Sequence, residues 1–331
     1  MQSFSTEQII SRGQHLGFSY KSFSFSIHGK YKSSDSLFNH RDIPHFNHLH
    51  QNLAGGYGNE GVYYGDVVSF IRYYKYFGVS FPILTLMKDD GKNRVLETYS
   101  FFCFQFLKLN EEVDTKDGCL SKITYHIGCK SKILLNLVVP YFKKLFNKSF
   151  DDYKNDDHPF LNRRADLRTN GYSFNKDNIS NFTYEDTLNI KKQNCFYDFE
   201  KSKNKNLMIN IHDLKDREMH RFNDLDILSF QIYKDDDLIK IYPVVCPHEG
   251  GFLGLNNKVG VKNTLQKFKK NECKVLCNIH NRKFEPIISI NLKNGKNLYI
   301  SNVYEFKISE NKLNIKLRDD LGTNVNQDWS K

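Results

Sequence analysis

At 331 residues the chain is long enough for two domains of ordinary size, and its 27 Phe and 19 Tyr can fill apolar cores. Its formal net charge of +10 does not indicate a nucleic-acid partner, because the lysines are interleaved with Asn, Asp and Glu and form no long basic block. We expect no membrane span, since no apolar run reaches the ~18–20 residues that cross a bilayer, and the N-terminus lacks the order of a signal peptide.

The first half of the chain consists mainly of runs rich in β-branched and aromatic residues. The segment 15–31 predicts a strand, and the polar, His-rich segment 36–50 has a weak helical pattern. Five further apolar runs predict strands of an antiparallel sheet: 65–77, 79–88, 94–109, 119–129 and 132–139.

A long helical segment, 140–168, follows these strands and begins at Pro140, since proline is favoured in the first turn of a helix. Pro159 inside this segment predicts a kink or a break. The order of elements predicts an α+β fold for 1–170, in which a curved sheet wraps around a long helix and leaves a cavity between them. The polar residues 171–194 are rich in turn formers and predict a linker.

The second half, 195–318, consists of short strand-like runs and predicts a small all-β domain. The run 228–246 predicts a hairpin with its turn at 234–237, and two inserted loops each carry a Cys/His pair. The last residues, 319–331, predict a tail. Seven cysteines are an odd number in a long chain, which argues against a disulfide scaffold and for a reducing, cytoplasmic location.

The two Cys/His pairs, Cys246-x-His248 and Cys277-x-x-His280, have the composition of a metal-cluster site. A [2Fe–2S] cluster needs four ligands, and two neutral imidazoles on one iron raise its reduction potential above that of a four-thiolate cluster. Two glycines follow the first pair and allow its loop to fold tightly. A zinc site with the same four ligands is the alternative, although zinc sites more often use Cys-x-x-Cys pairs.

This paired motif resembles the Rieske iron–sulfur domain, and the resemblance covers about residues 195–318. It implies that Cys246 and Cys277 hold one iron and that His248 and His280 hold the other. The respiratory Rieske proteins carry an additional Cys in each loop, which is missing here, so the likeness is to the oxygenase and ferredoxin type. The 28 residues between His248 and Cys277 exceed the usual spacing and predict an extra surface loop.

The His-rich segment of the first half contains the pattern Asn39-x-x-Asp42-x-x-His45-x-x-x-x-His50. Two His and one carboxylate on one side of an iron leave three positions open for oxygen and substrate. The pattern resembles the mononuclear-iron motif of Rieske non-heme iron oxygenases, whose catalytic domain has a helix-grip (START/SRPBCC-like) fold. This resemblance implies that His45 and His50 are iron ligands, and that Asn39 and Asp42 are catalytic residues, with Asp42 linking an iron histidine to a cluster histidine.

Several positions compete for the iron ligands. Residues five apart on an ideal helix differ by about 140° in azimuth, so His45 and His50 need a bend, and His48 is the reserve ligand. The resemblance places the third ligand on the long helix, where Asp157 fits best. The other candidates on this helix are Asp151, Asp152 and Asp156. Without a metal, the same residues form a His-rich surface helix and a solvated acidic face.

The two motifs together imply an oxygenase, although most members of the family place the Rieske domain before the catalytic domain. The implied reactants are O2 and an organic, partly apolar substrate, which is hydroxylated, desaturated or demethylated at a mononuclear Fe(II). The chain has no Gly-x-Gly-x-x-Gly motif, so a separate reductase or ferredoxin is implied as the electron donor. The family's trimers imply a homo-oligomer, which the swapped domain order puts in question.

Two other functions fit the same sequence. One is a Rieske electron carrier fused to a lipid- or ligand-binding helix-grip domain without mononuclear iron. The other is an assembly or regulatory protein that senses redox state through the cluster. Metal content distinguishes them, because the oxygenase holds about three irons and two sulfides per chain, and a carrier or sensor holds about two of each.

Overall fold

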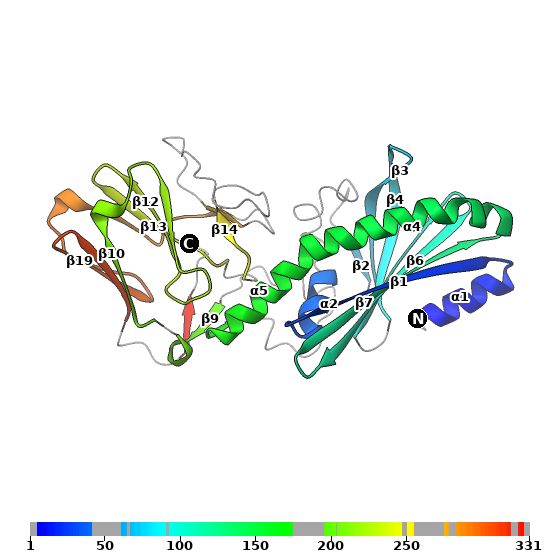
Figure 1. The fold of residues 1–331 in the computed structure, drawn as a ribbon, viewed down its shortest axis with the longest axis horizontal. Helices are drawn as coiled ribbons and strands as arrows, with labels where there is room; N and C mark the ends of the chain where they lie inside the picture. The colour runs from blue at the N-terminus through cyan, green and yellow to red at the C-terminus, as the bar shows by residue number, and fades with distance from the viewer. Residues whose placement is uncertain are drawn as a thin grey trace. The chain divides into compact units, whose positions relative to one another are not determined.

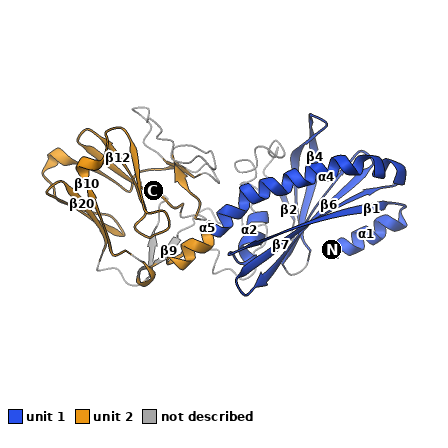
Figure 2. Cartoon of the chain, in the orientation of Figure 1, with its two compact units in different colours: residues 1–162, 181–190 blue, residues 163–180, 191–331 orange. Residues whose placement is uncertain are grey.

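The chain divides into two compact units, shown in Figure 2: residues 1–162 with 181–190, and residues 163–180 with 191–331. The computed structural model describes residues 5–41, 61–64, 67–90, 93–174, 195–202, 204–246, 250–254, 275–277, 283–318 and 324–327. The division falls within one helix, between Asn162 and Arg163, whereas the sequence places it after residue 170. The expected linker, 171–194, is described only as far as residue 174.

Unit 1 is built on a seven-stranded sheet in which every neighbouring pair is antiparallel (Figure 1). The strands lie in the order β1-β7-β6-β5-β4-β3-β2, so β2 to β7 follow the chain and β1 joins the sheet beside β7. The strands are β1 (Ser19–Gly29), β2 (Val62–Tyr64), β3 (Val67–Tyr76), β4 (Val79–Asp89), β5 (Arg94–Phe101), β6 (Phe104–Thr115) and β7 (Gly118–Cys129).

The apolar runs of the sequence predict most of this sheet. The runs 15–31, 79–88 and 119–129 match β1, β4 and β7. The run 94–109 contains two strands, because a two-residue turn at Phe102 and Cys103 separates β5 from β6. Phe102 takes a left-handed backbone conformation there, with φ at 51°, so an aromatic residue occupies a turn position that glycine or asparagine usually fills.

The long helix α4 (Lys132–Asn155) begins earlier than the sequence predicts. The expectation that 132–139 is a strand and that the helix starts at Pro140 is wrong, because Pro140 lies inside the helix. Ser131 caps the helix, and its hydroxyl accepts a hydrogen bond from the backbone N–H of Leu134 at 3.2 Å. The error arises because a short apolar run fits a buried strand and a helix equally well.

Burial in α4 follows a helical period and explains why this segment is not a strand. The buried side chains recur every three or four residues, which turns one stripe of the helix towards the sheet. They are Leu135, Phe142, Phe146, Phe150 and Tyr153. Ile133 and Leu137, which a strand would bury with Leu135, are 77% and 73% exposed.

A break separates α4 from α5 (Asp157–Thr169), as Pro159 predicts. Asp156 lies between the two helices, and Pro159 occupies the first turn of α5, where a missing backbone N–H is tolerated. Two shorter helices are α1 (Thr6–His15) and α2 (Ser33–Arg41). In the described residues, no helix combines the length and the apolar character needed to cross a bilayer.

The sheet and α4 enclose the core of unit 1, which is the helix-grip arrangement expected from the sequence. Figure 1 shows α4 lying across one face of the sheet, and the helix contacts β1 and β7. Aromatic rings from both layers meet there, for example Tyr125 and Phe146, whose stacked rings have centroids 4.2 Å apart. The helix α2 closes one end of this interior against β5, β6 and β7.

Unit 2 consists of small antiparallel sheets, in the orders β10-β20-β19-β18, β11-β12-β13-β17, β14-β15-β16 and β21-β9-β8. The expected hairpin turn at 234–237 is confirmed, because Asp235 pairs with Leu238 at its end. The expected tail contains a strand, β21, so 319–331 is not wholly irregular. The elements are β8 (Tyr172–Phe174), β9 (Cys195–Asp198), η3 (Phe199–Lys201), β10 (Asn206–Asn210), η4 (Ile211–Asp213), β11 (Met219–Phe222), β12 (Phe230–Asp235), β13 (Leu238–Pro243), β14 (Leu253–Gly254), β15 (Val275–Cys277), β16 (Lys283–Phe284), β17 (Ile288–Asn291), η5 (Leu292–Asn294), β18 (Leu298–Ile300), β19 (Tyr304–Ser309), β20 (Lys312–Leu317) and β21 (Asn324–Gln327).

Candidate functional site

Backbone hydrogen bonds join the two ends of the first Cys/His loop of unit 2. The backbone N–H of Cys246 donates to the carbonyl of Gly251 at 2.7 Å, and the N–H of Gly250 donates to the carbonyl of Cys246 at 2.8 Å. Gly250 has φ at +76°, a conformation that costs little only for glycine. The glycine pair therefore shapes this loop, as the sequence predicts.

Cys277 lies on a strand next to this turn. Val245 forms a bridge with Phe252, and Leu253 then pairs with Cys277 at the start of the β14–β15 ladder. Cys246 and Cys277 are both fully buried, at 0% exposure. Short strand pairing thus connects the two cysteines, although 31 residues separate them in the chain.

These two cysteines fit the thiolate half of a [2Fe–2S] site, since each is buried and each begins one of the two Cys/His loops. The other two expected ligands, His248 and His280, lie outside the described residues. Phe284, four residues past His280 in the chain, is buried in β16 and pairs with Val275. Within the described residues, no three or more His, Cys, Asp or Glu side chains are close enough to hold a metal ion.

Replacing Gly250 with alanine is expected to destabilise unit 2 by about 2–5 kcal/mol, from backbone strain and overpacking together. An added Cβ would lie 2.8 Å from both Leu167 Cδ1 and Phe174 Cζ. Gly295→Ala is the matched control, because Gly295 also has positive φ but its Cβ would meet nothing within 4 Å. We expect Gly295→Ala to lower the free energy of unfolding by only about 1–2 kcal/mol. Chemical denaturation measures both, and equal losses would contradict the packing of Gly250 against Leu167 and Phe174.

In unit 1, the structure describes only two residues of the expected mononuclear site. Asn39 is 1% exposed, and neither its amide oxygen nor its amide nitrogen has a hydrogen-bond partner in the described residues. Asp157 is 4% exposed at the start of α5. Asp42, His45 and His50 lie outside the described residues. A buried amide without a partner is costly, so Asn39 fits a site that a group from outside these residues completes.

The competing acidic residues differ from Asp157 in burial. Asp151 is exposed, with its carboxylate 3.8 Å from the ammonium of Lys154. Asp152 and Asp156 are half-buried. Asp157 is therefore the most deeply buried of the four candidates, which favours it as the third ligand. His48, the reserve ligand, lies outside the described residues.

Next to Asn39, a buried polar network centres on Glu112 of β6, which is 2% exposed. Its carboxylate accepts hydrogen bonds from Ser36 at 2.7 Å and from Ser121 at 2.5 Å. His40 Nε2 lies 3.3 Å from the same carboxylate, and Cys119 donates to it at 3.3 Å. The thiol of Cys119 stays protonated, because burial and the neighbouring Glu112 raise its pKa. This network fixes the last turn of α2 to the sheet.

Aromatic contacts extend from this network to the start of α5. The rings of His40 and Tyr153 are stacked with centroids 6.1 Å apart. The hydroxyls of Tyr153 and Tyr31 lie 3.3 Å apart, and the Tyr31 ring meets the edge of His158 at 5.8 Å. Because His158 follows Asp157 in the chain, these contacts bring the two described residues of the expected iron site to one end of unit 1. Sequence reasoning missed Glu112 and Tyr31.

An aromatic cavity of about 60 Å³ lies between the sheet and α4. Stacked rings line it, with Tyr74 and Tyr99 centroids 4.4 Å apart and Tyr125 and Phe146 centroids 4.2 Å apart. The cavity is lined by Arg72, Tyr74, Lys75, Tyr76, Glu97, Tyr99, Phe106, Leu107, Lys108, Tyr125, Leu145, Phe146 and Ser149. This is the space between sheet and helix that the element order predicts.

The acidic group of the cavity lining is the carboxylate of Glu97, which is 3% exposed. It accepts hydrogen bonds from Arg72 at 2.9 Å and from Tyr74 at 2.6 Å, and it lies 3.6 Å from the ammonium of Lys108. Burial opposes its ionisation, but the charges of Arg72 and Lys108 outweigh burial and hold the pKa of Glu97 at about 2. The Glu97 carboxylate is therefore already paired with Arg72, Tyr74 and Lys108.

The tyrosines of the cavity act as hydrogen-bond donors. Burial raises the pKa of Tyr74 and Tyr99 well above the ordinary value, so both hydroxyls stay protonated. The hydroxyls of Tyr76 and Tyr99 are 2.8 Å apart. Only one hydrogen can lie between two hydroxyl oxygens, so the other hydroxyl of the pair retains a hydrogen to donate. The polar lining thus offers donors to a bound molecule.

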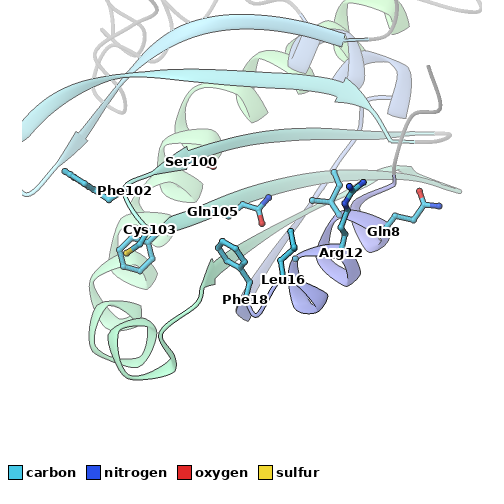
Figure 3. Close-up of a pocket in the computed structure, with 11 residues that line it drawn as sticks. Gln8, Arg12, Leu16, Phe18, Ser100, Phe102, Cys103 and Gln105 are labelled. Atoms are coloured by element: carbon cyan, nitrogen blue, oxygen red, sulfur yellow. The ribbon is translucent and has the colours of Figure 1, made fainter.

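A second, open pocket of about 290 Å³ lies between α1 and the turn that joins β5 to β6. Figure 3 shows Arg12 and Leu16 of α1 on one side of it, and Phe102 and Cys103 of the turn on the other. Phe102 is 83% exposed. The lining combines a single arginine with a single thiol, and it does not resemble either of the expected metal sites.

No family model matches the chain, and no curated protein matches it. Among solved structures, TTHA0849 from Thermus thermophilus is similar at 10% identity and a TM-score of 0.33, over 40% of this chain and 90% of that one. A START superfamily protein from Mycobacterium smegmatis is similar at 12% identity and a TM-score of 0.31, over 40% and 91%. The di-domain ARO/CYC BexL gives 6% identity and a TM-score of 0.34, over 43% and 49%. The helix-grip arrangement of unit 1 therefore rests on its own strand order and long helix.

Proposed function

We propose that the chain is a Rieske-type oxygenase component, which uses O2 and externally supplied electrons to oxidise an organic, partly apolar substrate. The observation that carries this proposal is the placing of two fully buried cysteines. Cys246 directly follows the Val245–Phe252 bridge, and Cys277 of β15 pairs with Leu253, the residue after Phe252. Each cysteine begins a loop whose sequence also supplies a histidine. Two Cys and two His in this pairing are the ligands of a Rieske-type [2Fe–2S] cluster.

In this proposal Cys246, His248, Cys277 and His280 hold the cluster in unit 2. His45, His50 and Asp157 hold the mononuclear iron in unit 1. The deep burial of Asp157 supports it as the third ligand over the other three aspartates. When bound, the cluster supplies single electrons and the iron supplies O2 activation. Glu112 holds α2 against the sheet, and thereby keeps the amide of Asn39 in the interior of unit 1.

The aromatic cavity supports a substrate that is planar and carries an acceptor oxygen. Stacked tyrosine rings suit a flat, apolar body, and the hydroxyls of Tyr76 and Tyr99 supply a donor. The carboxylate of Glu97 is occupied by Arg72 and Tyr74, so it does not select a cationic group. A carbonyl, ether or carboxylate oxygen on a ring fits this lining better than an amine. The electrons come from a separate reductase or ferredoxin.

The same cavity favours a second candidate function, a Rieske electron carrier fused to a ligand-binding helix-grip domain. The cavity is lined entirely by β3, β5, β6, β7 and α4. A ligand can therefore contact this lining without any of the expected iron ligands. The two functions share the cluster and differ in the mononuclear iron.

Electron paramagnetic resonance of the reduced protein, before and after addition of nitric oxide, distinguishes the two. An oxygenase shows the Rieske signal and a further signal that appears only with nitric oxide, because an open ferrous site binds it. His45→Ala is expected to remove the nitric oxide signal, lower the iron content by about one per chain and leave the Rieske signal unchanged. A Rieske signal without any nitric oxide response would support the carrier, and absence of the Rieske signal would contradict both.

A further inference from the structure

Arg163 of α5 contacts the turn that follows Cys246. Its Nε donates to the carbonyl of Gly250 at 3.3 Å, and its Nη2 donates to the carbonyl of Asp224 at 3.1 Å. The side chain is half-buried, and its guanidinium carbon lies 5.9 Å from the centre of the Phe252 ring. One arginine therefore ties the cysteine loop to the segment between β11 and β12.

The hydrogen bonds continue from this guanidinium to the cysteine itself. Arg163 donates to the carbonyl of Gly250, and the N–H of Gly250 donates to the carbonyl of Cys246 at 2.8 Å. Leu167 and Phe174 pack against the Cα of Gly250, where an added Cβ would lie 2.8 Å from each. The backbone of Cys246 is thus two hydrogen bonds from a cation, in a turn that side-chain packing holds in place.

The Nε and Nη2 hydrogen bonds of Arg163 go to neutral backbone carbonyls, and the nearby carboxylates of Asp224 and Asp166 only partly offset the effect of burial on its charged form. The nearest acidic side chain on the same segment, Asp224, pairs instead with Arg221, whose guanidinium lies 3.8 Å above the Phe252 ring. Burial lowers the pKa of Arg163, the mark of a cation that has lost part of its water. An arginine nevertheless stays protonated in proteins.

We propose that Arg163 is a positioning residue for Cys246 and that its charge raises the reduction potential of the cluster. This inference rests on the proposed function, because it requires the cluster to be present. Reduction adds one electron to the cluster, and a desolvated cation beside the ligand loop stabilises the more negative, reduced form. The hydrogen bond to Gly250 keeps that cation at a fixed place beside the loop.

The test compares midpoint potentials by redox titration of the reconstituted full-length protein, followed by its visible and resonance spectra. Arg163→Met removes the charge and keeps an unbranched side chain that reaches as far as the arginine Nε, and it is expected to lower the midpoint potential. Arg163→Lys keeps the charge but lacks the two guanidinium N–H groups that donate to the carbonyls of Gly250 and Asp224. Its midpoint potential is expected to lie closer to that of wild type than to that of Arg163→Met. Arg217→Met is the matched control, since Arg217 is 66% exposed and pairs with Asp235 on the same unit.

The outcomes separate this inference from the proposed function. If wild-type protein holds no cluster, the proposed function fails and this inference fails with it. If Arg163→Met holds the cluster at the wild-type potential, the inference is overturned and the proposed function stands. If Arg163→Met folds but does not assemble the cluster, the midpoint potential of Arg163→Lys tests the role of the charge. A potential equal to that of wild type supports this role, and a clearly different potential overturns it. A shift of equal size in Arg217→Met would contradict any role specific to Arg163.

Discussion

Replacing Cys277 with serine is expected to abolish the visible absorption and the resonance signal of the cluster. Cys277 is fully buried on β15 and pairs with Leu253 in the ladder that leads back to Cys246. A serine hydroxyl has nearly the same shape, so the strand pairing remains, but it does not replace a thiolate as a ligand of iron. Iron and sulfide analysis of the reconstituted protein should show loss of the sulfide and of about two irons per chain.

Cys103→Ser is the matched control for this substitution. Cys103 is exposed and lies in the two-residue turn between β5 and β6, in the other unit of the chain. We expect it to keep the full cluster. If Cys277→Ser retained wild-type iron and sulfide, the assignment of Cys277 as a ligand would be wrong.

Replacing Glu97 with glutamine is expected to destabilise unit 1 by about 3–5 kcal/mol. The Glu97 carboxylate is 3% exposed and accepts from Arg72 and Tyr74, with the Lys108 ammonium 3.6 Å away. An amide cannot balance the positive charge of Arg72, whose side chain is only 11% exposed. Removal of one partner of a buried ion pair leaves the other charge uncompensated, and this is the source of the large effect.

Chemical denaturation followed by tyrosine fluorescence measures this loss. Glu111→Gln is the matched control, because Glu111 lies on β6, the strand next to that of Glu97, and its carboxylate is 27% exposed and 3.2 Å from the ammonium of Lys122. We expect about 0–1 kcal/mol from the control. A loss below about 1 kcal/mol in Glu97→Gln would contradict the burial of this ion pair.

The pKa of Glu97 also predicts how stability depends on pH. Its folded pKa of about 2 lies below the ordinary value of 4.5, so the unfolded chain binds a proton more readily. The stabilisation is complete above pH 4.5 and is lost as the pH falls towards 2. At about 1.4 kcal/mol per pKa unit it amounts to roughly 3 kcal/mol. Denaturation curves between pH 7 and pH 3 should show a smaller decline for Glu97→Gln than for wild type.

The sequence predicts the sheet of unit 1 well, because β1, β4 and β7 are long, and burial alternates along most of β1 and β4. It fails at 132–139, where a short, almost continuous apolar run fits a buried strand but the Ser131 cap starts a helix. It also gives no separate prediction for α1, although Ser5 and Gln8 form a capping box at its start. The local pattern of apolar residues is enough to predict a long strand, whereas the start of a helix depends on a few capping hydrogen bonds.

The candidate sites also contain one feature that the sequence predicts and one that it does not. The positive φ of Gly250 follows from the motif, since glycine shortly after the buried Cys246 allows a tight loop. The network around Glu112 does not follow, because Ser36 and Glu112 are far apart in the chain and only the packing of α2 on β6 joins them. Four charged residues lie on β6, so charge alone does not single out Glu112. Tertiary contacts of this kind have no local pattern from which to predict them.

Metal and sulfide analysis of the anaerobically reconstituted chain is the decisive measurement for the proposed cluster and mononuclear iron. We expect about three irons and about two acid-labile sulfides per chain, with no zinc, and a reduced protein that shows the resonance signal of a cluster with mixed Cys and His ligands. Zinc bound to the second half of the chain, or a colourless protein that takes up no sulfide, would overturn the proposed function.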